Sequence, residues 1–171
     1  MILQYIKDLF PRIIYDESAD IIGPESLNFN CIMYAIGGQR YNIWPSYFRP
    51  IGYNTDKREV FWPTDLPNSE SLNNFIAMFR KFKYELCDDS SYEPDFRKIA
   101  IFCYFGTNQV SHASLMIGED LWASKIGKGH IIQHKLESLC GEVYGELRCF
   151  MKRLKTIPRS FNQSVFDMYV K

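Results

Sequence analysis

The stretch HASLMIGEDLWASKIG, residues 112–127, gives the clearest indication of the fold. It has two apolar runs, 112–118 and 121–127, on either side of a short acidic turn, which is the pattern of a β-hairpin. Further short apolar or alternating runs lie on both sides of it along the chain, at residues 98–105, 130–134 and 142–153. Because turn residues separate most of these runs, the second half of the chain is predicted to form an antiparallel β-sheet.

The first half of the chain has helical patterns instead. Residues 2–10 and residues 69–82 each repeat apolar side chains at helical spacing. Between them, residues 31–36 (CIMYAI) are apolar on every side and end at Gly37, which predicts a short buried helix. Helices followed by strands predict an α+β fold, with the short helix packed on the antiparallel sheet.

The remaining segments of the first half, residues 17–30 and the proline- and aromatic-rich residues 39–67, are predicted to be loops. The 171 residues suit a single domain with its own core. We divide it into an N-terminal helix and loop (1–26), a core (27–153) and a C-terminal appendage (154–171).

Composition excludes several classes of protein. Basic and acidic residues balance at 20 each, so no net positive field exists to attract nucleic acid. No apolar run approaches the roughly 20 residues that a membrane span needs, and the N-terminus lacks the features of a signal peptide. Five cysteines without a C-x-x-C pair indicate a reduced protein. We therefore expect a cytoplasmic protein, or one delivered to a target cell without a classical signal peptide.

A thiol and an imidazole are the candidate chemical groups. Cys31 stands where the short helix begins, and backbone N–H groups at such a position lower the pKa of a thiol. His112 stands at the start of a predicted strand and can act as the base. A cysteine on a helix followed by a histidine on a strand is the order found in papain-like thiol enzymes. The alternative is that Cys31 is inert, as most buried cysteines are.

The hairpin resembles the catalytic hairpin of NlpC-type cysteine peptidases, which belong to the papain-like superfamily. Residues 30–37 (NCIMYAIG) resemble the helix that carries the nucleophile of these enzymes. The chain is still more similar to a family of largely uncharacterised bacterial proteins, over residues 27–153. The motifs that carry this second resemblance are Asn30-Cys31, Trp44-Pro45, His112-Ala113, Trp-x-Ser-Lys-x-Gly at 122–127, Ile-x-His at 132–134 and Tyr144-Gly145.

The resemblance implies a third residue that orients the histidine from the second strand of the hairpin. Ser124 stands at that place, where the superfamily often has His, Asn or Gln. A three-residue turn would set Ser124 opposite Ser114 and on the face of His112, whereas a two-residue turn would bring Lys125 there instead. We favour Ser124. Lys125 could otherwise lower the pKa of the histidine or bind a substrate carboxylate.

Other polar and aromatic residues complete the candidate site. Asn30 is a candidate oxyanion donor, with ordinary turn chemistry as the alternative. Trp44, Trp62 and Trp122 are candidate walls of a substrate cleft. His130 and His134 would suit a zinc-binding helix by their spacing, but in a strand, which we predict, they lie about 13 Å apart and cannot share a metal. We expect neither a metal nor another cofactor.

The resemblance implies a cysteine-dependent hydrolase or acyl transferase that acts on an amide bond, such as a peptidase, an amidase or a deamidase. Expected substrates are a peptide, a protein side-chain amide or a peptidoglycan-like polymer. A bacterial toxin or effector of this kind would have a cognate inhibitor protein as its partner. The alternative is an inactive binding or immunity-type module on the same fold.

Overall fold

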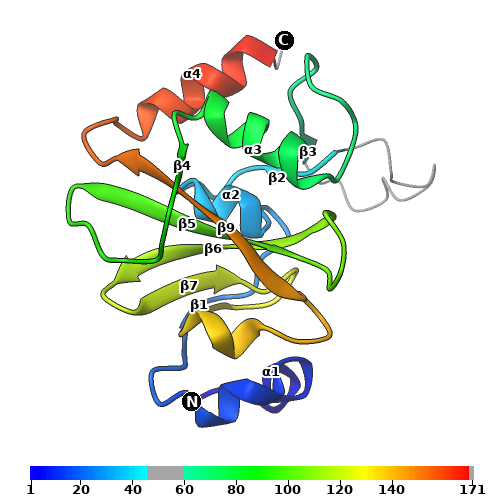
Figure 1. Cartoon of the computed structure of the whole chain (residues 1–171), viewed down its shortest axis with the longest axis vertical. Coiled ribbons are helices and arrows are strands. Elements are labelled where there is room, and N and C mark those ends of the chain that lie inside the picture. The colour runs from blue at the N-terminus through cyan, green and yellow to red at the C-terminus, as the bar shows by residue number, and fades with distance from the viewer. Residues whose placement is uncertain (46–59, 170–171) are drawn as a thin grey trace.

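A computed structural model of the chain describes residues 1–45 and 60–169, so the middle of the predicted loop 39–67 lies outside the described residues. The described part is an α+β protein with a mainly antiparallel sheet and few helices, which confirms the predicted fold class (Figure 1). The helical elements are α1 (Gln4–Leu9), η1 (Pro11–Tyr15), α2 (Cys31–Ala35), α3 (Leu72–Lys81), η4 (Leu136–Leu139) and α4 (Ser160–Tyr169).

Seven strands of the described residues form one sheet in the order β1-β8-β7-β6-β5-β9-β4. They are β1 (Asp20–Gly23), β4 (Glu85–Cys87), β5 (Phe96–Cys103), β6 (Val110–Gly118), β7 (Leu121–Lys125), β8 (Ile131–His134) and β9 (Glu146–Leu154). Two short strands, β2 (Asn42–Ile43) and β3 (Val60–Phe61), pair in parallel apart from this sheet. The antiparallel sheet predicted for residues 98–153 is therefore confirmed, but only β5 to β8 follow one another as a meander, since β9 lies beside β5 and not beside β8.

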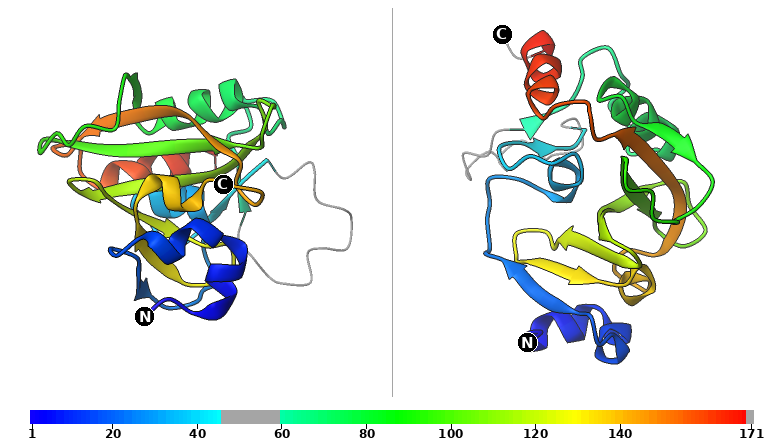
Figure 2. Two further views of the ribbon diagram at one scale, coloured as in Figure 1. Left: turned by 60° about the horizontal axis from the view of Figure 1, so that its bottom comes forward. Right: turned by 90° about the vertical axis from the view of Figure 1, so that its left-hand side faces the viewer.

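The sheet separates two hydrophobic clusters because side chains alternate between its faces. On β5, Ile99 and Ile101 belong to a cluster with α2, α3 and α4, whereas Ala100 and Phe102 belong to a cluster with α1, η1 and η4. Figures 1 and 2 show α3 and α4 at one end of the molecule and α1 at the other. Layers on both faces explain why β5 is apolar on every side.

The register of the β6–β7 hairpin combines the two alternatives that the sequence left open. The turn has two residues, Glu119 and Asp120, but a bulge between Met116 and Gly118 adds one residue to β6. Beyond the bulge Leu115 pairs with Ala123, which is the register of the three-residue turn. His112 and Ser124 therefore share a face, as predicted.

Two segments differ from their predicted description. Residues 17–30 include the edge strand β1, which pairs with β8 and was expected to be loop. The C-terminal appendage contains α4, whose Phe166 packs edge-on against Phe61 at 4.7 Å between ring centroids. This segment thus contributes to the larger hydrophobic cluster.

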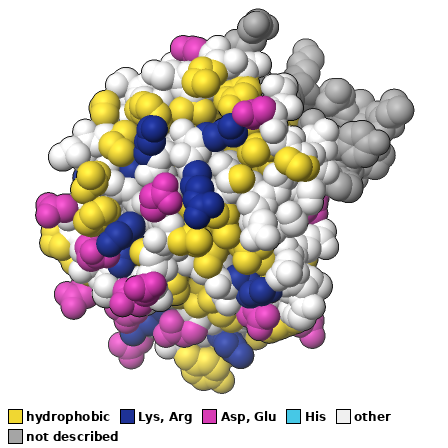
Figure 3. Space-filling model, turned by 45° about the horizontal axis from the view of Figure 1, so that its top comes forward, with side chains coloured by type: hydrophobic (Ala, Val, Ile, Leu, Met, Phe, Trp, Pro, Cys, Tyr) yellow, Lys and Arg dark blue, Asp and Glu magenta, His cyan; other side chains and the backbone are white. Residues whose placement is uncertain are grey.

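The surface mixes both signs of charge with apolar side chains on the face that Figure 3 turns toward the viewer. None of the helices within residues 1–45 and 60–169 has the length and apolar character that would let it cross a membrane.

Candidate functional site

Helix α2 places Cys31 at its first position. The side chain of Asn30 caps the helix, because its Oδ1 accepts a hydrogen bond from the Met33 backbone N–H at 3.1 Å. The same oxygen accepts from the N–H of Ile43 at 3.1 Å, and Nδ2 donates to the Ile43 carbonyl at 2.8 Å. Gly37, with φ of +93°, follows the helix in a conformation that side chains disfavour. Asn30 therefore ties the start of α2 to β2.

The Cys31 thiol is buried, with 8% of the residue exposed. Burial raises its pKa to about 11, although the backbone N–H groups of Ala113, Ile32 and Cys31 itself act in the opposite direction. The Ala113 N–H places the sulfur beside the residue that follows His112. Because the pKa is so high, Cys31 is a neutral thiol at pH 7.

His112 lies on β6 and is completely buried. Its ring stacks on Tyr144 with 4.0 Å between centroids and an angle of 8°, and Phe102 meets it edge-on at 5.6 Å. Gly145 allows this arrangement, since a Cβ there would lie 2.1 Å from the carbonyl oxygen of Cys103. Burial, and secondarily the nearby His134, hold the pKa of His112 well below 6.5. The imidazole is therefore neutral at pH 7.

Four buried side chains form a hydrogen-bonded cluster around the Ser124 hydroxyl. Ser124 Oγ lies 2.9 Å from His112 Nε2, 2.8 Å from His134 Nε2 and 2.7 Å from Ser114 Oγ. The other ring nitrogen of His134, Nδ1, lies 2.8 Å from the Lys135 carbonyl oxygen. All four side chains point to the same face of the sheet, on β6, β7 and β8.

The positions of the protons follow from these contacts. A carbonyl only accepts, so the Nδ1 of His134 carries a hydrogen. Burial lowers the pKa of His134 to about 4, so His134 is neutral at pH 7. Its Nε2 therefore has no hydrogen and must accept the one hydrogen bond that the Ser124 hydroxyl can donate. The Ser124 oxygen can then only accept from His112 Nε2–H and from Ser114. His112 is thereby fixed as the tautomer protonated on Nε2.

The remaining nitrogen of His112, Nδ1, consequently bears a lone pair. This atom is buried and makes no hydrogen bond to any atom of residues 1–45 and 60–169, including the Cys31 sulfur. An unsatisfied buried polar atom costs about 1–3 kcal/mol, and such atoms often have a catalytic role. The cluster thus presents an unprotonated base without a partner.

Lys125 lies away from this cluster, on the opposite face of β7. Its Nζ donates to the carbonyl oxygens of Ser26 at 2.8 Å and Gly127 at 2.6 Å, and it lies over the Phe29 ring. The structure therefore pairs His112 with Ser124 and excludes Lys125 as its orienting residue. Lys125 is nevertheless close enough to lower the pKa of Cys31 slightly.

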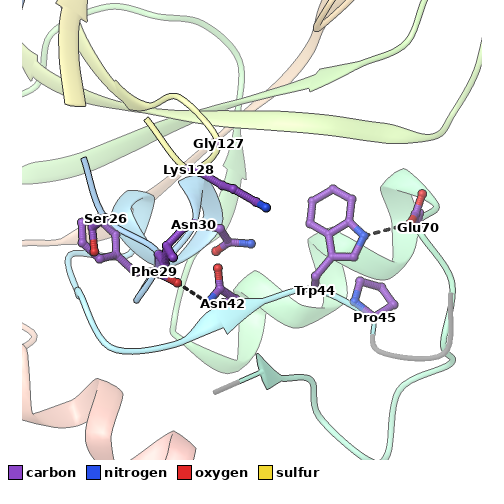
Figure 4. Close-up of a pocket in the computed structure, with 10 residues that line it drawn as sticks. Ser26, Phe29, Asn30, Asn42, Trp44, Pro45, Glu70, Gly127 and Lys128 are labelled. Atoms are coloured by element: carbon purple, nitrogen blue, oxygen red, sulfur yellow. Dashed lines mark hydrogen bonds between the residues drawn. The ribbon is translucent and has the colours of Figure 1, made fainter. Parts of the chain in front are cut away.

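A cavity of about 400 Å³ lies beside the start of α2. Asn30, Phe29 and Asn42 line it on one side, with Lys128 and Trp44 across from them (Figure 4). The Nε1 of Trp44 donates to Glu70 at 2.8 Å, which fixes the indole at the cavity wall. The cavity adjoins Asn30, the residue before the nucleophile candidate, but Cys31 itself does not line it.

Of the three tryptophans that were expected to line a substrate cleft, Trp44 lines this cavity, whereas Trp62 and Trp122 lie elsewhere. Trp62 is buried, donates to the Pro67 carbonyl and does not line this cavity. Trp122 is 1% exposed and packs on Phe150, in the cluster on the face of the sheet that also carries His112 and Ser124, opposite to the face that α2 covers. Trp122 follows the alternation of β7, which places it in the core.

His134 and Tyr144 are the site residues that sequence reasoning missed. Both stood in the motifs at 132–134 and 144–145, where His134 was considered only as a zinc ligand and Tyr144 was given no role. The alternation of β7 and β8 across their tight turn was the signal that places His134 on the face of Ser124. His130 lies outside this cluster and contacts Tyr5 at 2.7 Å.

No group of three or more His, Cys, Asp or Glu side chains in the described part of the chain is arranged to hold a metal ion. No curated protein and no solved structure matches the chain. A family model described as "Domain of unknown function (DUF7689)" matches residues 20–152, which include the helix, the hairpin and β8. Since this match covers more than half of the chain, the protein belongs to the DUF7689 family.

Proposed function

We propose that this protein is a cysteine-dependent hydrolase or acyl transferase that acts on an amide bond, with Cys31 as nucleophile and His112 as base. One observation carries the proposal: the buried His112 imidazole has its Nε2 at 2.9 Å from Ser124 Oγ, while its Nδ1 has no hydrogen-bond partner among residues 1–45 and 60–169. A base of this kind must reach the thiol, and here Cys31 packs on the face of β6 that carries Ala113, whereas the His112 side chain points to the opposite face. The proposal therefore requires the two groups to approach each other when the substrate binds.

The proposed reaction starts from a neutral pair, because the pKa of Cys31 is raised and that of His112 is lowered. His112 Nδ1 accepts the thiol proton while the sulfur bonds to the substrate carbonyl carbon, whose oxygen becomes the oxyanion. The C–N bond then breaks, and the leaving amine takes the proton from Nδ1. Water, activated by the same nitrogen, attacks the thioester and restores the thiol; another acceptor in place of water gives acyl transfer.

Backbone N–H groups are the donors that this mechanism assigns to the oxyanion. The Met33 N–H is occupied by Asn30, whereas the N–H groups of Cys31 and Ile32 face the sulfur. We assign Asn30 a supporting role, since its oxygen and one amide hydrogen are engaged with Met33 and Ile43. The oxyanion donors are then fixed by the helix itself.

The cavity beside Asn30 supports a substrate with a compact group rather than a long polymer segment. Phe29 and Trp44 offer apolar walls, while Asn42, Glu70 and Lys128 offer polar ones. A volume of about 400 Å³ holds one large side chain or a small molecule. We therefore favour a small amide or a side-chain amide as the substrate.

A binding module without turnover is the second candidate. It is favoured by the burial of the Cys31 thiol and by the absence of a hydrogen bond between it and His112 in the described part of the chain. In that case the hydroxyl cluster would only stabilise the sheet.

Alkylation by iodoacetamide at pH 7.5, followed by mass spectrometry, distinguishes the two candidates. Cys149 is the internal control, because burial raises its pKa to about 11 as it does for Cys31, while Cys149 is the less buried of the two. With His112 as base, Cys31 is expected to react at least about tenfold faster than Cys149. The His112→Ala variant should abolish this difference. Slower reaction of Cys31 than of Cys149 in the wild-type protein would contradict the enzyme proposal.

A further inference from the structure

Two arginines face each other on neighbouring strands, away from the candidate catalytic cluster. Arg97 of β5 and Arg153 of β9 are directly opposite in the antiparallel register. They share the face of Ile99 and Met151, which is the face that α2 covers. Like charges directly opposite one another destabilise a sheet. The pair therefore does not stabilise the sheet by itself, which points to a role in binding an anion.

Arg153 adds a second anomaly, because it is only 2% exposed. Its Nη1 donates to the Phe82 carbonyl at 3.0 Å and to Asn162 Oδ1 at 2.7 Å, and its guanidinium lies over the Tyr84 ring. No carboxylate among the described residues forms an ion pair with it, and its Nε and Nη2 hydrogens make no hydrogen bond to those residues. Buried charges are normally paired with an opposite charge. The guanidinium therefore has donors left for a ligand.

A cavity of about 490 Å³ opens onto this pair. Lys155 and Arg159 line it together with Arg97 and Arg153, and none of its lining residues is acidic. Its other walls are largely apolar and aromatic: Tyr34, Leu115, Met116, Ile117, Leu154, Ile157 and Pro158. A volume of this size is typical of small-molecule sites.

We propose that this groove binds a small organic phosphate, with the phosphate between Arg97 and Arg153 and the organic part against the apolar wall. Guanidinium groups match phosphate oxygens in a bidentate manner, and four cations favour a dianion over a monocarboxylate. A phosphate between the two arginines also removes their repulsion. The size of the cavity and the zero net charge of the chain argue for a small molecule rather than nucleic acid.

Isothermal titration of the full chain with phenyl phosphate tests the proposal, with inorganic phosphate and benzoate as the comparison ligands. We expect phenyl phosphate to bind most tightly. Arg97→Gln and Arg159→Gln should each weaken its binding, the former by about tenfold or more. Arg80→Gln removes the same charge from an exposed position on α3 and should leave binding unchanged. Absence of phenyl phosphate binding, or full binding by Arg97→Gln, would overturn the proposal.

Two further outcomes are informative. Equal affinity for inorganic phosphate and phenyl phosphate would overturn the assignment to an organic ligand. In the absence of ligand, Arg97→Gln should be at least as stable toward denaturant as the wild-type protein, since it removes a repulsion. A marked loss of stability together with unchanged binding would show instead that Arg97 is a structural residue.

Discussion

Ser124 has one hydroxyl proton, and three side chains lie within hydrogen-bonding distance of its oxygen. A serine that orients an imidazole is an uncertain acceptor when it stands alone, because its hydroxyl can donate as well. Here Nε2 of the neutral His134 accepts a hydrogen bond from that hydroxyl, because its Nδ1–H already donates to the Lys135 carbonyl. His134 thus turns Ser124 into an acceptor, and is a positioning residue for His112.

The first prediction concerns this chain of hydrogen bonds. In His134→Leu the Ser124 hydroxyl is free to donate to His112 Nε2, so His112 should shift toward the tautomer protonated on Nδ1. Nitrogen-15 NMR of labelled histidine reports the tautomer directly. The alkylation rate of Cys31 should fall roughly tenfold or more, as happens when a catalytic histidine adopts the wrong tautomer.

Two variants control for simple loss of packing. His134→Gln offers an amide oxygen as a replacement acceptor and should largely restore the Nε2–H tautomer. Ser114→Ala removes a donor to the Ser124 oxygen but leaves the hydrogen bonds from His134 through Ser124 to His112 intact, and should leave the tautomer of His112 unchanged. An Nε2–H tautomer that persists in His134→Leu would disprove the role of His134, whatever the outcome for Cys31.

Cys31, His112 and Ser124 could be named as candidates from the sequence because helix starts, strand alternation and motif spacing are local properties. It left Ser124 and Lys125 as alternatives because one bulge residue in β6 changes the face of every residue before it, and a bulge depends on tertiary packing. The contact of His134 with Ser124 was missed for a related reason. Its partner lies on a neighbouring strand, so its role follows only from the register of β7 and β8.

At the scale of elements, α2 is short and depends on its surroundings. Five residues are too few for a helix that is stable by itself, so capping and packing must fix its start. The Asn30 side chain makes three hydrogen bonds that join α2 to β2. The position of the thiol thus depends on a residue that was expected to act on the substrate.

We therefore predict that Asn30→Ala lowers the free energy of unfolding by about 2 kcal/mol, because a cap and two further hydrogen bonds are lost. Asn30→Asp keeps the accepting oxygen and should recover about half of this loss. Denaturant unfolding measures both. If Asn30→Ala is as stable as the wild-type protein, the cap does not determine the position of α2.

Edge elements were harder to predict than central ones. Residues 98–153 were recognised because alternation and turns recur there, but β1 has only four residues and is followed directly by Pro24. Its pairing with β8 supplies order that its own sequence does not signal. The described parts of the predicted loop 39–67 contain β2 and β3, which have two residues each. These strands were missed because their pairing with each other, and not their own sequence, orders them.

At the scale of the whole molecule, α4 closes the cluster that surrounds α2. Phe166 contacts the rings of Tyr41, Phe61 and Phe82, which come from three separate segments of the chain. The chain end was expected to be an appendage because its sequence alone gives no partner. Its packing makes the C-terminal helix part of the structure that supports the site.

Phe166→Ala should accordingly lower the free energy of unfolding by about 3–5 kcal/mol, the usual cost of removing a buried aromatic ring. Met168→Ala is the matched control on the same helix, since Met168 is 68% exposed and should change stability little. Thermal or denaturant unfolding provides the measurement. Equal stability of the two variants would show that α4 is not part of the cooperative fold.

The pH dependence of Cys31 alkylation is the decisive test of the proposal that His112 acts as the base for Cys31. A thiol whose pKa is about 11 reacts through its thiolate, so without a base its rate rises about tenfold per pH unit through neutrality. The pKa of His112 lies well below 6.5, so His112 remains an unprotonated base at neutral pH. Its capacity to accept a proton is lost only when the pH falls below that pKa. We predict that the wild-type rate is nearly independent of pH between 6.5 and about 8, and that His112→Ala shows the tenfold rise alone. The same steep rise in both proteins would contradict the claim.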